Sequence, residues 1–171
     1  MSINFYDGDL LKSNCNYICH QVNCQGAMNS GIAKQIRQDY PIVYNQYKGF
    51  CEGLNDYVKH SINPETHLLL GRTQIIPIKV NKDGPIQSIV NLFAQNRYGY
   101  DGCQYTSYDA FARCLCDLTY KVPKGSKIGF PYGIGCVRGG AKWPVVLALI
   151  TEYLAADYEV EIWRFNADEK K

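Results

Sequence analysis

The sequence predicts an α/β fold, a three-layer α/β/α sandwich around a mixed, mostly parallel central sheet. First, strand-like and helix-like segments alternate along the chain. Second, Tyr17–Val22 is a short, mostly apolar run, which is typical of a parallel strand buried on both faces. Third, two β-rich runs are separated by a few turn residues, which predicts one antiparallel pair. With 171 residues the chain has the size of one domain, which we place at 1–165, followed by a polar tail at 166–171.

The first third of the chain predicts two strands and two helices. Ile3–Tyr6 is expected to be a short strand, and Tyr17–Val22 is the buried strand already named. Ser30–Asp39 has helical periodicity and ends before Pro41, a residue that disfavours helical backbone in the position before it. A second, short helix is expected over Val43–Glu52.

The middle of the chain predicts a hairpin. His67–Val80 and Ile86–Phe93 are both rich in β-branched and apolar residues. The residues between them, 81–85, contain Asp83-Gly84, a dipeptide that favours a tight turn. These two runs are therefore expected to pair antiparallel.

The last part of the chain predicts two helices and two strands. Apolar residues recur at helical spacing from Tyr108 to Leu118, after a cap at Thr106 or Ser107. Lys127–Pro131 and Glu159–Phe165 are expected to be strands, and Pro144 suits the first turn of the helix between them. Six apolar residues are predicted to form the inner face of that helix: Val145, Val146, Leu149, Ile150, Tyr153 and Leu154.

Composition excludes several classes of protein. The net charge is +2, from 18 basic and 16 acidic residues, and no run of Lys or Arg suggests a track for a phosphate backbone. No apolar run approaches the roughly 20 residues of a membrane span, and the first eleven residues lack the order of a signal peptide. The expectation is a cytoplasmic protein with no membrane partner.

The eight cysteines leave alternatives open. They could form a disulfide framework or a metal site, but they fall inside predicted strands and helices instead of paired C-x-x-C knuckles. Buried free thiols are the favoured reading. Three scattered histidines add no ligand cluster, so neither a metal nor another cofactor is predicted.

Two loops rich in small residues lie where a strand leads into a helix. They are Gln25–Gly31 and Gly133–Gly140. Small side chains let a backbone approach an oxyanion, and the open N–H groups at a helix start attract its charge. Two such loops facing each other would hold a diphosphate, although either loop alone is explained by tight turns. Neither loop spells a Walker A or a Rossmann fingerprint.

Four motifs carry a family resemblance. They are Gly8-Asp9-Leu10, the run from His20-Gln-Val-Asn-Cys-Gln-Gly26 into Gly31-Ile-Ala-Lys34, Asn91-Leu-Phe-Ala-Gln95, and Pro131-Tyr-Gly-Ile-Gly-Cys136. In this order, across nearly the whole chain, they resemble the macrodomains, a family that binds ADP-ribose. The first loop is most similar to the branch with the yeast ADP-ribose-1″-phosphate phosphatase and the terminal ADP-ribose protein glycohydrolases.

The resemblance implies a set of ligand-binding residues. Asp9 would accept the exocyclic amine of adenine, although a turn residue explains it equally well, and Phe165 would stack on the ring or simply pack. The distal ribose would lie near Met28 as well as near two of the catalytic candidates below. The remaining implied ligand-binding residues are Leu10, Ser30, Gly31, Ile32, Ala33, Asn91, Gly133, Ile134, Gly135, Cys136, Val137 and Arg138.

The resemblance also implies four catalytic candidates: His20, Asn23, Gln95 and Asp101. His20 stands where the phosphatase relative carries a His and could activate a water, but it is as readily a hydrogen-bonded core residue. Asp101 lies on a loop that could close over the distal ribose, or it is only a turn residue. The glycohydrolase relatives use a Lys and an Asp where this chain has Gln95 and Gly139. Lys34 is expected to be solvated.

The predicted function is therefore binding of ADP-ribose with hydrolysis of a substituent on its distal ribose. Removal of a 1″-phosphate is the favoured reaction, and removal of ADP-ribose from protein or nucleic acid comes second. The alternative is a non-catalytic module that binds or sequesters ADP-ribose or a related NAD-derived nucleotide. The expected partners are ADP-ribose or an ADP-ribosylated molecule, with nucleic acid only if ADP-ribosylated, and the expected state is a monomer.

Overall fold

The computed structural model describes residues 2–58, 68–79 and 86–166. The strands in this part of the chain are β1 (Ile3–Asp7), β2 (Tyr17–Asn23), β3 (Thr73–Lys79), β4 (Ile86–Gln95), β5 (Lys127–Pro131) and β6 (Glu159–Arg164). The helices are α1 (Gly31–Asp39), α2 (Pro41–Val58), α3 (Tyr108–Lys121), α4 (Trp143–Leu154) and the short 3-10 helix η1 (Leu10–Lys12).

The six described strands form one mixed sheet, in the order β1-β6-β5-β2-β4-β3. Every neighbouring pair is parallel except β3 and β4, which pair antiparallel. This confirms the predicted mixed, mostly parallel sheet and its antiparallel pair, while the turn expected at 81–85 lies outside the described residues. β3 is shorter than predicted, because residues 68–71 form turns before the strand begins at Thr73.

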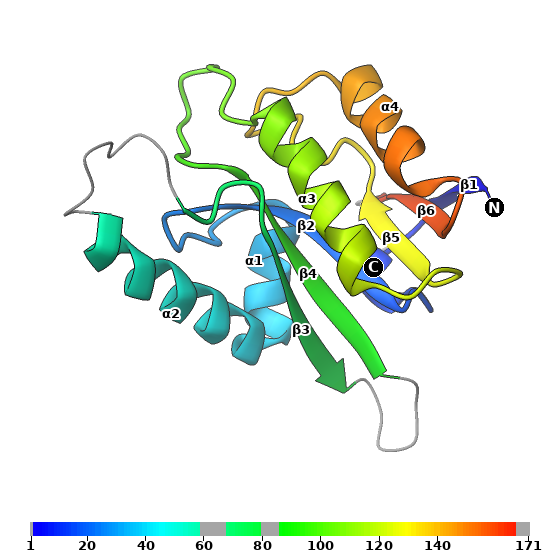
Figure 1. Ribbon diagram of the computed structural model, residues 1–171, viewed down its shortest axis with the longest axis horizontal. Coiled ribbons are helices and arrows are strands. Elements are labelled where there is room, and N and C mark those ends of the chain that lie inside the picture. The colour runs from blue at the N-terminus through cyan, green and yellow to red at the C-terminus, as the bar shows by residue number, and fades with distance from the viewer. Residues whose placement is uncertain (1, 59–67, 80–85, 167–171) are drawn as a thin grey trace.

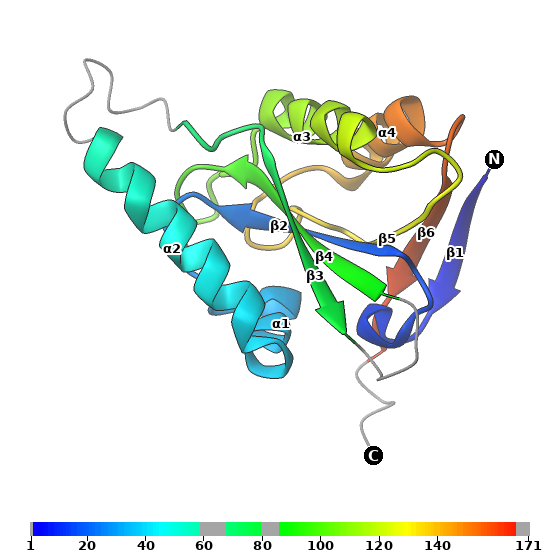
Figure 2. The same ribbon diagram turned by 60° about the horizontal axis from the view of Figure 1, so that its bottom comes forward.

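Two helical layers cover the sheet (Figure 1). In Figure 2, α3 and α4 lie together on one face of the sheet and α1 and α2 on the other. The first face carries the largest hydrophobic cluster, in which Phe111 and Leu115 of α3 and Ile150 of α4 pack on the strands. The second face carries two smaller clusters, one of which includes Ile36 of α1 and the other Tyr47 of α2. The three-layer sandwich is therefore present as predicted.

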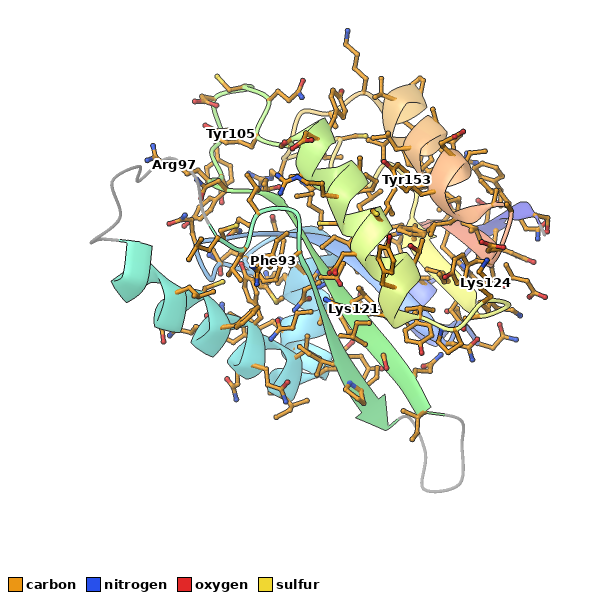
Figure 3. The ribbon with its side chains drawn as sticks, in the orientation of Figure 1. Phe93, Arg97, Tyr105, Lys121, Lys124 and Tyr153 are labelled. Carbon is orange, nitrogen blue, oxygen red and sulfur yellow. The ribbon has the colours of Figure 1, made fainter. Side chains whose placement is uncertain are left out.

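Two helices differ from their predicted form. α2 runs over 18 residues instead of Val43–Glu52, because Pro41 needs no N–H partner in a first turn and the helix continues through Gly53. In α4, Val146, Ile150 and Leu154 are buried, while Val145 and Tyr153 are 38% and 37% exposed. Its inner face is thus narrower than predicted, since Tyr153, which Figure 3 labels near α3 and α4, is partly exposed.

The cysteines test one further expectation. All eight cysteines are free thiols, and five are buried. Cys103 is exposed, so the prediction of buried thiols is wrong at that position. Among the described helices, none is long and apolar enough to cross a membrane.

The parallel strands bring several chain segments to one edge of the sheet. β1, β2, β4, β5 and β6 all run in the same direction, so their carboxyl ends meet there. The segments that follow them include η1, the loop before α1, the 96–107 segment before α3 and the loop before α4. Ligands of open α/β sheets bind at this edge.

Candidate ligand-binding cleft

A cleft of about 760 Å³ opens at the carboxyl ends of the strands. Its lining comes from the ends of β2, β4, β5 and β6, from the segment after β1, and from both small-residue loops. The two loops, far apart in the sequence, thus face one cavity. The volume lies within the range of sites that enclose a small-molecule ligand.

The first loop ends at the start of α1 with open amides. Ser30, Gly31, Ile32 and Ala33 all line the cleft. Ser30 is the N-cap residue, but its side chain makes no capping hydrogen bond, whereas Ser107 Oγ caps α3 by accepting from Ala110 N at 3.1 Å. The first N–H groups of α1 are therefore left for a ligand, together with the positive end of the helix dipole.

Asn23 lines the cleft but organises the first loop with its side chain. Its Nδ2 donates to Ala27 O at 2.8 Å, and its Oδ1 accepts from Gln25 N at 2.9 Å and from the hydroxyl of Tyr47 at 2.9 Å. Both polar ends of the amide are engaged in this turn. The geometry therefore gives Asn23 a role in shaping the loop.

The second loop is built on glycines. Gly133 and Gly135 have φ of +72° and +74°, a region that side chains with a β-carbon rarely adopt. Gly133, Ile134, Gly135, Val137 and Arg138 line the cleft. Ile134 is only 4% exposed and packs into the core, while Val137 is 90% exposed, so the loop is anchored at one residue and open at the other.

One end of the cleft, here called the Asp9 end, lies at the ends of β1 and β6. It is lined by Asp9, Leu10 and Phe165, which are three of the ligand-binding residues that the family resemblance implies. Asp9 Oδ1 accepts from Leu11 N at 3.0 Å and Oδ2 accepts from Gln35 Nε2 at 3.4 Å. Each carboxylate oxygen can accept a second hydrogen bond, so Asp9 is both fixed and able to receive a donor from a ligand.

The other end, here called the Gln95 end, lies beyond β4. Gln95 Oε1 accepts from Gln21 Nε2 at 2.7 Å, and Gln95 Nε2 donates to Arg97 O at 3.0 Å. Tyr98 and Tyr100 also line this end, and the Arg138 guanidinium stacks 4.2 Å from the centre of the Tyr100 ring. That contact joins the second loop to the 96–107 segment, which carries Arg97 and Tyr105 (Figure 3).

Two of the four catalytic candidates lie outside this cleft. His20 is completely buried under the α1–α2 layer, and burial lowers its pKa from 6.5 to about 4. Asp101 is on the surface, where hydrogen bonds from Cys103 N and then from the Tyr105 hydroxyl lower its pKa. Neither side chain is among the lining residues, so the geometry does not bring either one to a ligand in the cleft.

Three of the implied ligand-binding residues are also absent from the lining. Met28 is fully buried against α2, while its neighbours Ala27 and Asn29 face the cleft. Asn91 is buried beside His20 on β4. Cys136 is half-buried and packs against the core, because its thiol turns back to donate to Ile134 O.

The lining contains residues that the sequence analysis did not assign. Gln21 follows His20 on β2, so its side chain points to the opposite face of the sheet. A polar residue in a strand that is otherwise mostly buried was the signal that could have identified it. Tyr98 and Tyr100 belong to an aromatic loop that was noted only for Asp101. Lys34 was expected to be solvated; it is exposed, yet it borders the cleft beside Gln35.

The electrostatics of the cleft favour an anion. Of the described residues that line it, Asp9 alone carries a carboxylate, while Lys34 and Arg138 are cationic. The N-terminal amides of α1 add a partial positive charge. No group of three His, Cys, Asp or Glu side chains is placed to hold a metal ion in the described part of the chain.

Comparison with known proteins gives matches by sequence, although no family model matches the chain. A 90-residue stretch is 32% identical to the ADP-ribose 1″-phosphate phosphatase of Scheffersomyces stipitis and covers 49% of this chain and 47% of that protein. Over 172 residues the chain is 27% identical to the DNA ADP-ribosyl glycohydrolase of Thermus aquaticus, covering 96% of this chain and 41% of the relative. The matches thus span less than half the length of these curated relatives.

Solved structures match over nearly the whole chain. The macrodomain of Mycobacterium tuberculosis DarG superposes with a TM-score of 0.67 at 21% identity, covering 94% of this chain and 96% of that one. Thermosipho africanus DarTG in complex with ADP-ribose superposes with a TM-score of 0.67 at 18% identity, covering 98% of this chain and 43% of that one. The fold of this chain is therefore that of the DarG macrodomain.

Proposed function

We propose that the cleft binds ADP-ribose, with adenine at the Asp9 end, the diphosphate between the two loops, and the distal ribose at the Gln95 end. The observation that carries this proposal is the convergence of the loops, since Gly31–Ala33 and Gly133–Arg138 line one cavity. Main-chain amides from both sides suit a diphosphate, whose oxygens accept hydrogen bonds in every direction. The solved complex of a structurally similar protein with ADP-ribose supports the choice of ligand.

Hydrolysis of a substituent on the distal ribose is the second part of the proposal. The two curated relatives are named for reactions at that sugar, one on a 1″-phosphate and one on ADP-ribosylated DNA. We favour 1″-phosphate removal, because the Arg138 guanidinium borders the cleft and suits a terminal phosphate. Gln95, Tyr98 and Tyr100 would position the sugar.

A non-catalytic binder is the competing function, and one observation favours it. At the Gln95 end, the described lining offers amides, tyrosines and a guanidinium, but neither a carboxylate nor an imidazole to act as a general base near pH 7. Gln95, which stands where glycohydrolase relatives have a Lys, cannot act as a nucleophile. Such a module would read or sequester ADP-ribose without turnover.

One set of assays separates these functions. The wild-type chain is incubated with ADP-ribose-1″-phosphate, with ADP-ribosylated DNA and with ADP-ribosylated protein, and released phosphate or ADP-ribose is measured. Calorimetric titration with ADP-ribose is run in parallel. Phosphate release that falls at least about tenfold in Arg138→Ala, with Lys142→Ala as a cationic control outside the lining, supports the phosphatase.

The other outcomes are equally informative. Release from DNA or protein alone would replace the phosphatase by a glycohydrolase. Binding of ADP-ribose without turnover of any substrate would support the binder. No heat with ADP-ribose would overturn the whole proposal.

We further propose that residues 1–165 act as one monomeric unit in the cytoplasm, with 166–171 as a polar tail. Gel filtration with light scattering at several concentrations tests the monomer, and a dimer mass would contradict it. Truncation after Phe165 should leave ADP-ribose affinity unchanged if the tail has no part in binding.

A further inference from the structure

Gln21 on β2 joins three segments beneath the cleft. Its Nε2 donates to Gln95 Oε1 at 2.7 Å and to Thr106 Oγ1 at 2.8 Å. Gln95 belongs to the end of β4, and Thr106 precedes α3. The amide of Gln21 therefore connects Gln95, in the wall of the Gln95 end, to the segment that precedes α3.

Thr106 continues this connection to the second loop. Its hydroxyl donates to Gly135 O at 2.9 Å. The main-chain amides of Tyr105 and Thr106 both donate to Gly139 O, at 2.8 and 2.9 Å. The result is a hydrogen-bonded chain in which Gln21 and Thr106 link Gln95 to the carbonyl of Gly135.

The second loop also rests directly on these side chains. A β-carbon at Gly135 would lie 2.6 Å from Gln21 Oε1 and 3.0 Å from Thr106 Oγ1. One at Gly139 would collide with Thr106 Oγ1 and with the carbonyl oxygen of Gly135. Gln21 Oε1 is itself buried without a hydrogen-bond partner. A buried polar atom without a hydrogen bond lowers the stability of the fold. The two hydrogen bonds that Nε2 donates and the contact of the side chain with the second loop offset this loss.

We propose that Gln21 is a positioning residue that sets the second loop against the Gln95 end, so that the diphosphate site and the distal-ribose site form together. The inference rests on the proposed function, because it assigns these two parts of the ligand to the two places that Gln21 connects. Gln21 acts through Gly135 and Gln95. A ligand that occupies only the Asp9 end does not depend on it.

The test compares two ligands in four proteins. Gln21→Met keeps the length of the side chain and removes both donated hydrogen bonds, Thr106→Val removes the hydroxyl, and Thr106→Ser retains it. Gln21→Met and Thr106→Val should weaken ADP-ribose binding by about 5- to 10-fold. AMP, which lacks the second phosphate and the distal ribose, should bind within about twofold of wild type, and Thr106→Ser should bind both ligands as wild type does.

Amide hydrogen exchange without ligand adds a readout on the loop itself. In Gln21→Met, exchange should accelerate across residues 133–140 and stay unchanged in β5, which lies before the loop. A general loss of stability would accelerate both regions. If Gln21→Met fails to fold, Thr106→Val carries the same comparison.

Two results overturn the inference. Equal weakening of AMP and ADP-ribose in Gln21→Met and Thr106→Val would show a general structural role, and unchanged ADP-ribose affinity in both would show no role. These failures leave the proposed function intact. Absence of ADP-ribose binding by the wild-type chain would instead overturn the proposed function, and the inference with it.

Discussion

Nε2 of His20 lies 2.5 Å from Oδ1 of Asn91, across the parallel pair of β2 and β4. The Asn91 amide is oriented by its own Nδ2, which donates to Gln74 Oε1 at 3.0 Å. Because Oδ1 can only accept, His20 Nε2 carries the proton in the neutral ring. Nδ1 is then an unprotonated nitrogen, buried without a partner. His20 is thus a core residue of the α1–α2 face and is neutral in the folded state.

This burial predicts a pH dependence of stability. Desolvation lowers the pKa of His20 from 6.5 to about 4 in the folded chain, whereas the unfolded chain titrates near 6.5. Between these values the unfolded state binds more protons, so stability present above pH 6.5 is lost as the pH falls towards 4. The contribution approaches about 3 kcal/mol at most. Urea unfolding of wild type and His20→Gln between about pH 7.5 and about pH 4.5 measures it.

The comparison with His20→Gln removes the background from other groups, since both proteins share every carboxylate. The free energy of unfolding should fall more steeply with decreasing pH in wild type than in the variant. Parallel curves would show that His20 does not titrate differently in the two states.

Asp9 predicts selectivity for the base of the nucleotide. If Asp9 accepts the adenine amine, wild type should bind ADP-ribose about tenfold more tightly than the inosine analogue, whose exocyclic carbonyl oxygen accepts hydrogen bonds and cannot donate. Asp9→Asn keeps an oxygen for Leu11 N and should narrow that preference to about twofold. Calorimetric titration of both ligands checks this. An unchanged preference in Asp9→Asn would move the base away from Asp9.

The position of Gly139 has no room for a side chain. In Gly139→Ala, the new β-carbon collides with Thr106 Oγ1 and with the backbone oxygen of Gly135, so the second loop must move. We expect a loss of about 2–4 kcal/mol in the free energy of unfolding and at least about tenfold weaker ADP-ribose binding.

Gly102→Ala is the matched control for Gly139→Ala. Gly102 has a φ of +77° and no atom within 4 Å of an added β-carbon, so only backbone strain of about 1 kcal/mol is expected, with unchanged ADP-ribose affinity. Thermal or urea unfolding and calorimetry measure both variants. Equal effects of the two substitutions would contradict the close packing of the second loop.

The fold was predictable because its signals are local. β5, the start of α1 next to Ser30 and the cap of α3 at Ser107 were recognised from short patterns, and the sheet followed from alternation of strands and helices. The full length of α2 was not, since the helix was expected only over Val43–Glu52 and tertiary packing extends it at both ends.

The loops of the candidate site were predictable, because main-chain groups form them. The face of the sheet toward which a strand side chain points was not. Both glycine loops line the cleft, as expected. His20 and Gln21 are neighbours on β2, so their side chains point to opposite faces of the sheet. An error of one residue in assigning these faces places His20 in the cleft instead of Gln21. Asp101 lies outside the lining for a different reason, because its carboxylate accepts a hydrogen bond from the Tyr105 hydroxyl within its own loop.

The central claim is that two glycine-bearing loops enclose a diphosphate, and a crystal structure of the chain with ADP-ribose tests it most directly. We predict phosphate oxygens within about 3 Å of main-chain nitrogens from both Gly31–Ala33 and Gly133–Arg138. Phosphates held by only one loop, or a nucleotide bound outside the cleft, would contradict the account.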